Sequence, residues 1–358
     1  MDSEEVNRRF SGHTDAVTSV AYARDARFIV SAGADQRVLV WLARSRAILR
    51  DFSGHAGHVE ALALAADGRR ILSAGADGAL IAWDMHHGAL TTLFEEATTV
   101  FNAAALSPDG TRALSDSTEN ELLLWDVSTG ALLARWPAHE DFITSVAFSP
   151  ADGTRAVSTS WDGTAIVWDL AAQTALFTLE GHEDALSAAA FSPDGAQLVT
   201  ASSDATLIVW DAASGDEIHR LEGHEDEVIA VAYSPDGARI ASAGADQVVL
   251  LWDAASGELV QRLEGGHTDW INALAFSSDG ATLASGGWDA RIVLWDTASG
   301  TQARALTWHR GTVYRLVWED SAHLLSASAD RSIVRWDVAQ GAPQVINRQH
   351  LEDVIALD

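Results

Sequence analysis

The sequence contains no cysteine and no lysine among its 358 residues, so all 23 of its Lys and Arg residues are arginines. Without cysteine, the chain has no disulfide, no thiolate metal ligand and no cysteine nucleophile. Without lysine, it has neither the lysine of a phosphate-binding P-loop nor the amine of a Schiff-base mechanism. The two absences exclude several classes of enzyme. A lysine-free composition rich in alanine and arginine favours a GC-rich bacterial gene or an engineered one.

Long apolar runs and a basic leader are also lacking. No run of about 18 apolar residues is present, which predicts that no helix spans a membrane. Residues 1–5 are acidic, whereas a secretory signal would begin with basic and then apolar residues. Hydrophobic residues make up 47% of the chain, enough for a packed core. We therefore expect a soluble cytoplasmic protein.

Positive charge is scarce and unevenly placed. The net charge is −28, yet residues 1–70 carry 9 acids and 10 arginines, and residues 291–358 carry 8 acids and 7 arginines. The remaining 34 acids and 6 arginines lie in residues 71–290. This surface is a poor one for nucleic acid, which requires clustered cations. The uneven charge predicts an electrostatic potential that is more negative on one side of the molecule and would orient a basic partner. As an alternative, the acidic residues serve solubility alone.

One dipeptide recurs at nearly constant spacing along the chain. Seven Trp-Asp dipeptides share one register, and Trp41-Leu42 occupies the same register with the aspartate replaced. The successive tryptophans lie 42, 42, 43, 42, 42, 43 and 41 residues apart. Self-similarity at this period predicts a repeat architecture. The seven dipeptides are Trp83-Asp84, Trp125-Asp126, Trp168-Asp169, Trp210-Asp211, Trp252-Asp253, Trp295-Asp296 and Trp336-Asp337.

The sixth repeat shows what one unit contains. Four β-branched or alternating stretches, residues 228–233, 238–243, 248–252 and 258–263, are separated by turn signals such as Pro235-Asp236-Gly237. Four short antiparallel strands cannot bury both of their faces alone. Eight such units in register therefore predict an all-β, closed eight-bladed propeller with four antiparallel strands in each blade.

The Gly-His, the turn aspartate and the Trp-Asp at fixed offsets resemble the WD-repeat β-propeller family over nearly the whole chain. In that family a histidine before the first strand bonds to a Ser or Thr on the second, and a turn aspartate and the third-strand tryptophan complete the set. The resemblance implies seven such structural tetrads here: His13, Ser31, Asp35, Trp41; His55, Ser73, Asp77, Trp83; His139, Ser158, Asp162, Trp168; His182, Thr200, Asp204, Trp210; His224, Ser242, Asp246, Trp252; His267, Ser285, Asp289, Trp295; and His309, Ser326, Asp330, Trp336.

The third repeat departs from this pattern. Ala97 and Glu119 stand where the histidine and the turn aspartate should be. Each lost hydrogen bond is worth about 1 kcal/mol, and more if a buried partner stays unpaired. We expect the third blade to be the least stable of the ring.

Histidines and acids lie close together in sequence without indicating chemistry. The stretch GHEDE at residues 223–227 resembles a metal or acid–base site. Its histidine, however, is assigned to a structural tetrad, in which every buried polar group has a hydrogen-bond partner. The seven equivalent histidines would each lie within their own blade, so we expect no metal ion; His86-His87 and the pair His55 and His58 are incidental. No nucleophile elbow, HExxH or phosphate-binding glycine loop is present. We expect no catalytic residue, no metal and no cofactor.

Aromatic residues break the regularity of the repeats at particular places. Of the 14 tryptophans, 8 are the third-strand residue; Trp161 and Trp288 instead precede a turn aspartate, where other repeats have small residues. Phe142 and Trp270 follow a Gly-His histidine by three residues. Exposed aromatics and arginines anchor interfaces, whereas Trp318 is interpreted as core. The predicted partner-binding residues are Phe142, Trp161, Trp270, Trp288, Arg310, Tyr314 and Arg331.

These residues predict a non-enzymatic platform for protein or peptide partners on the face that carries the Gly-His loops, with neither nucleic acid nor membrane as a partner. Three alternatives stay open. The aromatic rings pack against one another without binding anything, the ring is an engineered or idealised one without a natural ligand, or an enzyme site lies on the propeller axis.

Both ends of the chain resemble parts of a repeat. Residues 350–354 match 13–17, and residues 5–11 resemble a fourth strand. Either residues 5–11 or residues 344–349 can supply the outer strand of the last blade. We expect residues 1–341 to form the single propeller, with residues 5–11 closing that blade. Residues 342–358 would then be an extra segment that resembles the start of a ninth repeat.

Overall fold

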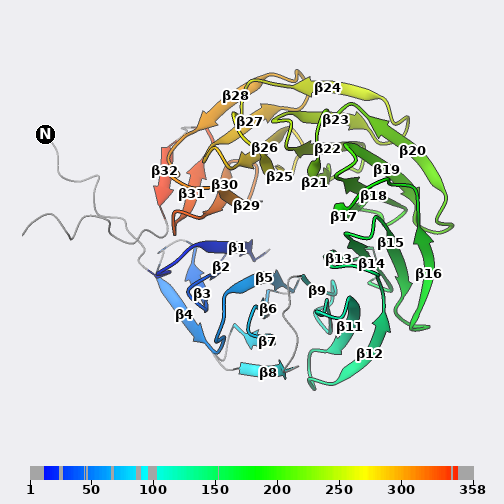
Figure 1. Cartoon of the computed structure of the whole chain (residues 1–358). Helices are drawn as coiled ribbons and strands as arrows, with labels where there is room; N and C mark the ends of the chain where they lie inside the picture. Colours follow the sequence, from blue (N-terminus) through cyan, green and yellow to red (C-terminus); the bar gives the residue numbers. More distant parts are fainter. Residues whose placement is uncertain are drawn as a thin grey trace, which may run out of the picture.

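Eight antiparallel sheets of four strands each lie around a common axis in the computed structural model, which confirms the predicted eight-bladed propeller (Figure 1). The structure describes residues 12–23, 27–43, 45, 47–65, 68–85, 90–95, 103–151, 153–339 and 342–345. Within those ranges all the regular elements are strands, and no helix is long and apolar enough to cross a membrane.

Each blade takes four strands consecutive in sequence, and the first strand of each is the one nearest the axis (Figure 1). Blades one to four contain β1 (Val17–Tyr22), β2 (Phe28–Gly33), β3 (Arg37–Leu42), β4 (Ile48–Ser53); β5 (Val59–Leu64), β6 (Arg70–Gly75), β7 (Ala79–Asp84), β8 (Leu90–Glu95); β9 (Ala104–Leu106), β10 (Arg112–Ser115), β11 (Glu121–Asp126), β12 (Leu132–Pro137); and β13 (Ile143–Phe148), β14 (Arg155–Ser160), β15 (Ala165–Asp169), β16 (Thr174–Leu179). Blades five to eight contain β17 (Leu186–Phe191), β18 (Gln197–Ser202), β19 (Thr206–Asp211), β20 (Glu217–Glu222); β21 (Val228–Tyr233), β22 (Arg239–Gly244), β23 (Val249–Asp253), β24 (Leu259–Leu263); β25 (Ile271–Phe276), β26 (Thr282–Gly287), β27 (Ile292–Asp296), β28 (Gln302–Leu306); and β29 (Val313–Trp318), β30 (His323–Ser328), β31 (Ile333–Asp337), β32 (Ala342–Val345).

The strands predicted for the sixth repeat agree with β21–β24 to within one residue at each end. The turn between the first two strands contains Gly237 at φ +72°, a conformation that a residue without Cβ adopts at little cost. In the third blade, β9 and β10 have only three and four residues, so its two inner strands pair over a shorter length than those of the other blades.

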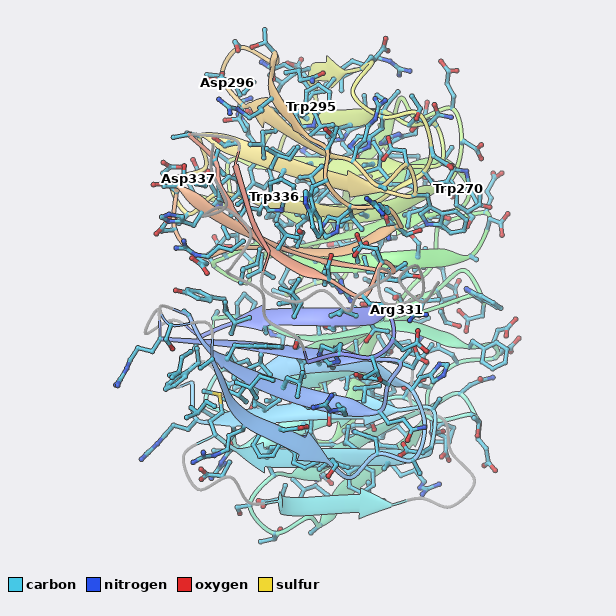
Figure 2. The ribbon with its side chains drawn as sticks, turned by 90° about the vertical axis from the view of Figure 1, so that its left-hand side faces the viewer. Trp270, Trp295, Asp296, Arg331, Trp336 and Asp337 are labelled. Carbon is cyan, nitrogen blue, oxygen red and sulfur yellow. The ribbon has the colours of Figure 1, made fainter. Side chains whose placement is uncertain are left out.

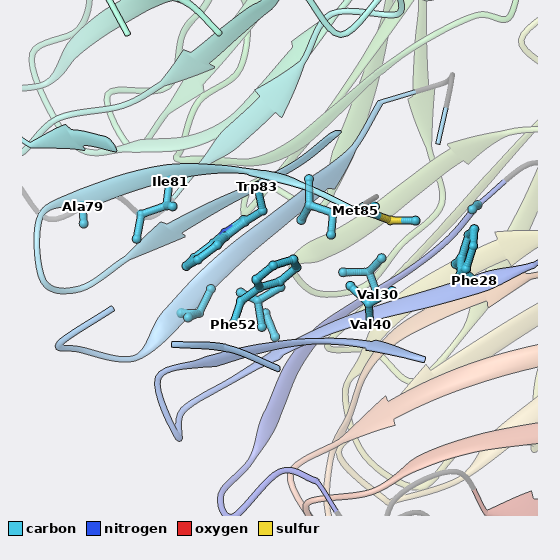
Figure 3. Packing of buried hydrophobic residues seen from close by; sticks show 13 residues of the cluster. Phe28, Val30, Val40, Phe52, Ala79, Ile81, Trp83 and Met85 are labelled. Carbon is cyan, nitrogen blue, oxygen red and sulfur yellow. The ribbon is translucent and has the colours of Figure 1, made fainter. Parts of the chain in front are cut away.

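The hydrophobic core is divided into clusters that fill the space between neighbouring blades. Figure 3 shows the cluster between blades one and two, in which Val30 and Val40 face Ile81 and Trp83. The ring of Trp83 stacks on Phe52 with centroids 4.8 Å apart. Each blade covers one face of the next blade. The ring therefore buries apolar side chains that an isolated four-stranded sheet would expose to water.

Three of the additional tryptophans belong to this packing. The Trp136 ring stacks on Trp168 with centroids 5.1 Å apart, and its Nε1 donates to the carbonyl of Gln173. Trp318 is partly buried between blades seven and eight, and its Nε1 donates to the Ala275 carbonyl at 2.9 Å. The interpretation of Trp318 as a core residue agrees with this position, and Trp308 packs in the same cluster.

The ring closes where blade eight meets blade one. Trp41 and Ile29 of blade one are buried with Leu325 and Ile333 of blade eight in one cluster. The near-neutral ends of the chain therefore form adjacent blades, as predicted.

The fourth strand of blade eight corrects one expectation. β32 pairs with β31 along residues 334–337, so residues 342–345 occupy the place that we assigned to residues 5–11. The prediction that the whole of 342–358 lies outside the blade is therefore wrong for these four residues. A short hairpin from β31 closes at a small entropic cost, whereas recruiting the opposite chain end closes a very long loop. Residues 5–11 and 346–358 lie outside the described residues.

Candidate partner-binding face

The propeller has two chemically different faces (Figure 2). Trp270 and Arg331 lie toward one side of the ring, and Asp296 and Asp337 lie toward the other. Asp296 accepts the backbone N–H groups of Ala298 and Ser299, at 3.1 and 2.7 Å, and so holds the loop that leads to the fourth strand. The opposite side carries the loops before the first strands and the turns between second and third strands. We call it the Gly-His face.

Each of the seven predicted tetrads is brought together beneath this face. In the sixth blade, Trp252 Nε1 donates to Ser242 Oγ at 2.9 Å, Ser242 Oγ lies 2.7 Å from His224 Nε2, and His224 Nδ1 lies 2.8 Å from Asp246 Oδ2. The same contacts recur in the other six sets at 2.7–3.2 Å. The stretch GHEDE is thus part of a structural relay.

In three of the tetrads the surroundings favour the neutral form of the histidine beside the turn aspartate. Burial lowers the pKa values of His55, His139 and His182, although the partner aspartate opposes the shift. Burial raises the pKa of Asp330, but hydrogen bonds from His309, Ser332 and the Arg310 N–H outweigh it and bring the pKa to about 2. A neutral imidazole with hydrogen on Nδ1 donates to the carboxylate and accepts the Ser or Thr hydroxyl at Nε2.

The tetrads also fix the loop geometry. The turn carboxylate in each complete blade accepts the N–H of the residue after the histidine as well as the histidine itself, as Asp162 does with Glu140 and His139, both at 3.0 Å. Within the part of the chain that is described, no three His, Asp or Glu side chains form a group able to hold a metal ion. The tetrads are therefore a support for the loops above them.

The third blade keeps only part of this relay. Trp125 Nε1 still donates to Ser115 Oγ at 3.0 Å, and the buried Asp116 accepts the Ala103 N–H at 2.9 Å. Glu119 lies in the turn, whereas Ala97 lies outside the described residues. That this blade is the least stable stays a prediction.

Two aromatic pairs stand on the Gly-His face. The rings of Phe142 and Trp161 lie edge to face with centroids 5.5 Å apart, and those of Trp270 and Trp288 are 5.0 Å apart. Their residues nevertheless remain 48%, 57%, 39% and 52% exposed, respectively. The alternative that these rings only pack against one another is therefore correct in part. The rings of each pair are in contact, but each ring also keeps a large surface exposed to solvent.

A repeated backbone contact explains why these residues pair. Trp161 N–H donates to the Phe142 carbonyl at 3.0 Å, and Trp288 N–H donates to the Trp270 carbonyl at 2.9 Å. The equivalent bond in blade one joins Ala34 to the Ala16 carbonyl. The fold therefore juxtaposes these two positions in every complete blade, but only blades four and seven fill both of them with aromatic side chains.

Carboxylates surround the aromatic pairs. Asp141 and Asp269 directly precede Phe142 and Trp270 and are exposed. The loops of blades five and six, which lie between blades four and seven in the ring, expose further acids. Those acids are Glu183, Asp184, Glu225 and Asp226.

The three remaining predicted residues belong to blade eight. Arg310 and Arg331 are exposed on the Gly-His loops, and Arg331 Nε lies 3.9 Å from the carboxylate of Asp15 in blade one. Tyr314 instead lies on β29 and lines a cavity among innermost strands. Asp15 and His58 of the Gly-His loops line the same cavity, and the role of Tyr314 in partner binding stays a prediction.

Sequence reasoning overlooked Arg315, although the repeats contain a signal for it. Arg315 stands six residues after the histidine position of its repeat, where the other seven repeats have only serine or alanine. Those seven residues are Ser19, Ala61, Ala103, Ser145, Ala188, Ala230 and Ala273.

Comparisons with known proteins agree with this geometry. A family model described as WD domain, G-beta repeat matches seven segments: residues 4–41, 46–84, 130–169, 173–211, 215–253, 257–296 and 300–337. The divergent third repeat falls in the unmatched interval. Among solved structures, the chain resembles the crystal structure of the computationally designed Ika8 protein, with a TM-score of 0.83 and 29% identity over 92% of this chain and 98% of that chain. No curated protein matches the sequence.

Proposed function

The chain belongs to the WD40 repeat family, whose propellers commonly serve as interaction scaffolds and are usually non-catalytic, and from that premise we propose that it is a non-enzymatic platform that binds a protein or peptide on its Gly-His face. The observation that carries the proposal is the presence of two exposed aromatic pairs at equivalent positions of blades four and seven. Clustered exposed aromatic rings on rigid loops are the usual anchors of an interface.

The acids around these rings support a basic partner. Exposed carboxylates flank both pairs and occupy the two blades between them. An arginine or lysine of a partner placed over Trp161 or Trp288 would gain a cation–π contact, and the neighbouring carboxylates would attract the same charge. A segment rich in Arg and Lys therefore fits this face better than a neutral or acidic one.

The alternative, a repeat ring without a natural ligand, gains some support from the similarity to a designed protein. Purely architectural repeats would have no reason to place large exposed rings at a few positions where the remaining blades carry small ones. The two aromatic pairs therefore favour binding.

The proposal is tested by selecting binders from a displayed library of random peptides, first on the wild type and then on W161A/W288A. We expect the wild type to enrich peptides rich in Arg and Lys. Loss of two anchors of about 1–2 kcal/mol each should weaken these peptides at least tenfold. Raising the salt concentration from about 50 mM to about 500 mM should weaken them as well, because screening acts on exposed charges.

A matched control removes exposed apolar side chains elsewhere. Leu133 and Val260 are 41% and 43% exposed on the outer strands β12 and β24, so L133A/V260A should bind the peptides like the wild type. If the tryptophan variant keeps full affinity, the aromatic pairs are not the binding site. If the wild type enriches no peptide, the ring without a ligand becomes the better description.

A further inference from the structure

A cavity of about 640 Å³ opens among the innermost strands of blades one, two, seven and eight. Its walls include Thr18 of β1, Glu60 of β5, Asn272 of β25, and Tyr314 and Arg315 of β29. These strands border the axis of the ring (Figure 1). The cavity is therefore axial. Neither the Phe142–Trp161 pair nor the Trp270–Trp288 pair contributes to its lining.

The cavity opens toward the Gly-His face. Asp15 and His58, which belong to the loops before β1 and β5, contribute to its lining, together with Ala34 after β2. A ligand could thus enter from the face on which the partner is proposed to bind.

Arg315 is the exceptional residue of this cavity. Within the described ranges its guanidinium makes neither a hydrogen bond nor an ion pair, and it is exposed on the wall of the cavity. The protein atoms around it lower the pKa of Arg315 without neutralising the guanidinium. A guanidinium that faces a cavity without an ion-pair partner is free to bind an anion.

The same wall carries hydrogen-bond acceptors that lack a donor. Asn272 Oδ1 is buried and has no hydrogen-bond partner among the described residues. In blade one the residue at the equivalent position, Thr18, donates its hydroxyl to the Val59 carbonyl of the next blade at 2.6 Å, a contact that an amide oxygen cannot make. Glu60 adds a carboxylate to the lining. A ligand that donates hydrogen bonds would therefore pair with Asn272 Oδ1 and the Glu60 carboxylate.

We propose that the axial cavity binds a carboxylate that has a hydrogen-bond donor beside it, with the carboxylate on the Arg315 guanidinium and the donor facing Asn272 and Glu60. The planar guanidinium can donate two parallel hydrogen bonds to a carboxylate. Free hydroxy or amino acids and the C-terminal residue of a peptide share this chemistry. A phosphate dianion fits less well, because Glu60 and Asp15 would repel its second charge.

The test follows the side-chain Nε–H signal of Arg315 in protein labelled with ¹⁵N-arginine, identified by its loss in R315A. The probes are L-serine, glycolate, the peptide Gly-Gly-Ser, its C-terminal amide and inorganic phosphate, each at up to about 10 mM, which detects millimolar affinity. We expect a saturable shift with the acids and none with the amide. Whether the free acids or the peptide bind more tightly identifies the source of the carboxylate.

Two variants separate binding from folding. R315A introduces the residue type that most other repeats carry at this position, so its melting temperature should equal or exceed that of the wild type while its acid affinity, measured by calorimetry, falls at least tenfold. R304Q removes an arginine on the outer strand β28 and should keep the affinity. W161A/W288A should also keep it, so failure of the proposed partner binding would leave this result unchanged.

Three outcomes would overturn the proposal. The Arg315 signal could stay unmoved by every acid, the amide could bind as tightly as the acid, or phosphate could bind more tightly than all of the carboxylates. Equal affinity of R315A and the wild type would likewise show that Arg315 is not the anchor.

Discussion

At the scale of single residues, the tetrads show how a buried polar relay supports a loop. The hydroxyl of Ser242 accepts from Trp252 and meets His224, so one oxygen satisfies two buried nitrogens. In the third blade, Ser115 accepts from Trp125, but the position of the histidine is held by Ala97. The two equivalent serines therefore differ in the number of buried nitrogens that they hydrogen-bond: two for Ser242 and one for Ser115.

Removing these two hydroxyls should have unequal effects. S242A leaves two buried nitrogens without a partner and should lower the free energy of unfolding by about 2–3 kcal/mol, whereas S115A affects one and should cost about 1 kcal/mol. Urea unfolding followed by tryptophan fluorescence measures both. S242T is the matched control, because Thr200 makes the same contacts in blade five, and it should stay close to the wild type. Equal losses in S242A and S115A would contradict the shared-hydroxyl account.

The titrating groups of the tetrads predict a loss of stability in acid. Burial lowers the pKa of His55, His139 and His182 below the ordinary 6.5, so their contribution is complete above about pH 6.5 and is lost as the pH falls through the lowered values. Asp330, with a pKa of about 2, contributes fully above pH 3.8, and that contribution is lost between pH 3.8 and about 2.

Urea midpoints at a series of pH values between about 7.5 and 3 should therefore decline in two stages, first below the ordinary histidine pKa and then below that of aspartate. A midpoint that stays constant until the aspartates titrate would show that the buried histidines contribute nothing to the pH dependence.

At the scale of the strand and turn, the blades share one backbone conformation in the turn between the second and third strands, although the side chains there differ. The residue after the turn aspartate, or after Glu119 in blade three, has a positive φ in every blade, and it is glycine only in blades two and four. Those glycines are Gly78 and Gly163, whereas blade five has Ala205 at φ +66°. A side chain in this conformation carries strain that glycine lacks.

A205G should accordingly raise the free energy of unfolding, by about 0.5–1 kcal/mol, since relief of left-handed strain exceeds the added entropy of the unfolded chain. Urea unfolding of the variant measures the change. A172G provides the control, because Ala172 is an exposed loop residue with an ordinary φ, and there glycine should lower stability by a similar amount. The interpretation is wrong if both variants change stability in the same direction.

At the scale of the whole molecule, the ring depends on the contacts that join its two ends. Blade eight packs on blade one through one buried cluster, and β32 completes blade eight along the outer edge of β31. Because a closed ring leaves no blade with an uncovered face, damage at the junction affects both neighbours. The closure also places the near-neutral blades side by side, opposite the acidic arc that is proposed to attract a basic partner.

Deleting residues 342–358 should lower the melting temperature by at least about 3 °C, because losing a paired strand costs several kcal/mol and each kcal/mol is worth about 1–2 °C in a chain of this length. Calorimetry of the truncated chain checks this. Deleting only 346–358 keeps β32 and should leave the melting temperature close to that of the full chain. An unchanged value for the longer deletion would mean that residues other than β32 complete the blade.

Much of this molecule follows from local sequence. The eight repeats in register predict the number of blades. The strands of the sixth repeat are predicted to within one residue because each blade consists of hairpins between strands that are neighbours in sequence. The tetrads could be assigned for the same reason. Partners such as His224 and Asp246 lie only 22 residues apart, within a unit whose strand order leaves them little choice of neighbour.

Contacts between distant blades decided what the sequence left open. The sequences of residues 5–11 and 344–349 do not decide which segment forms the outer strand of blade eight. In the structure residues 342–345 form it, through the short connection to β31. Tyr314 and Arg315 line an axial cavity because strands of four blades meet at the axis. The sequence thus determined the repeating unit, since its bonds are local, and only the closed ring decided the closing strand and the axial site, since these arise where residues far apart in the chain come together.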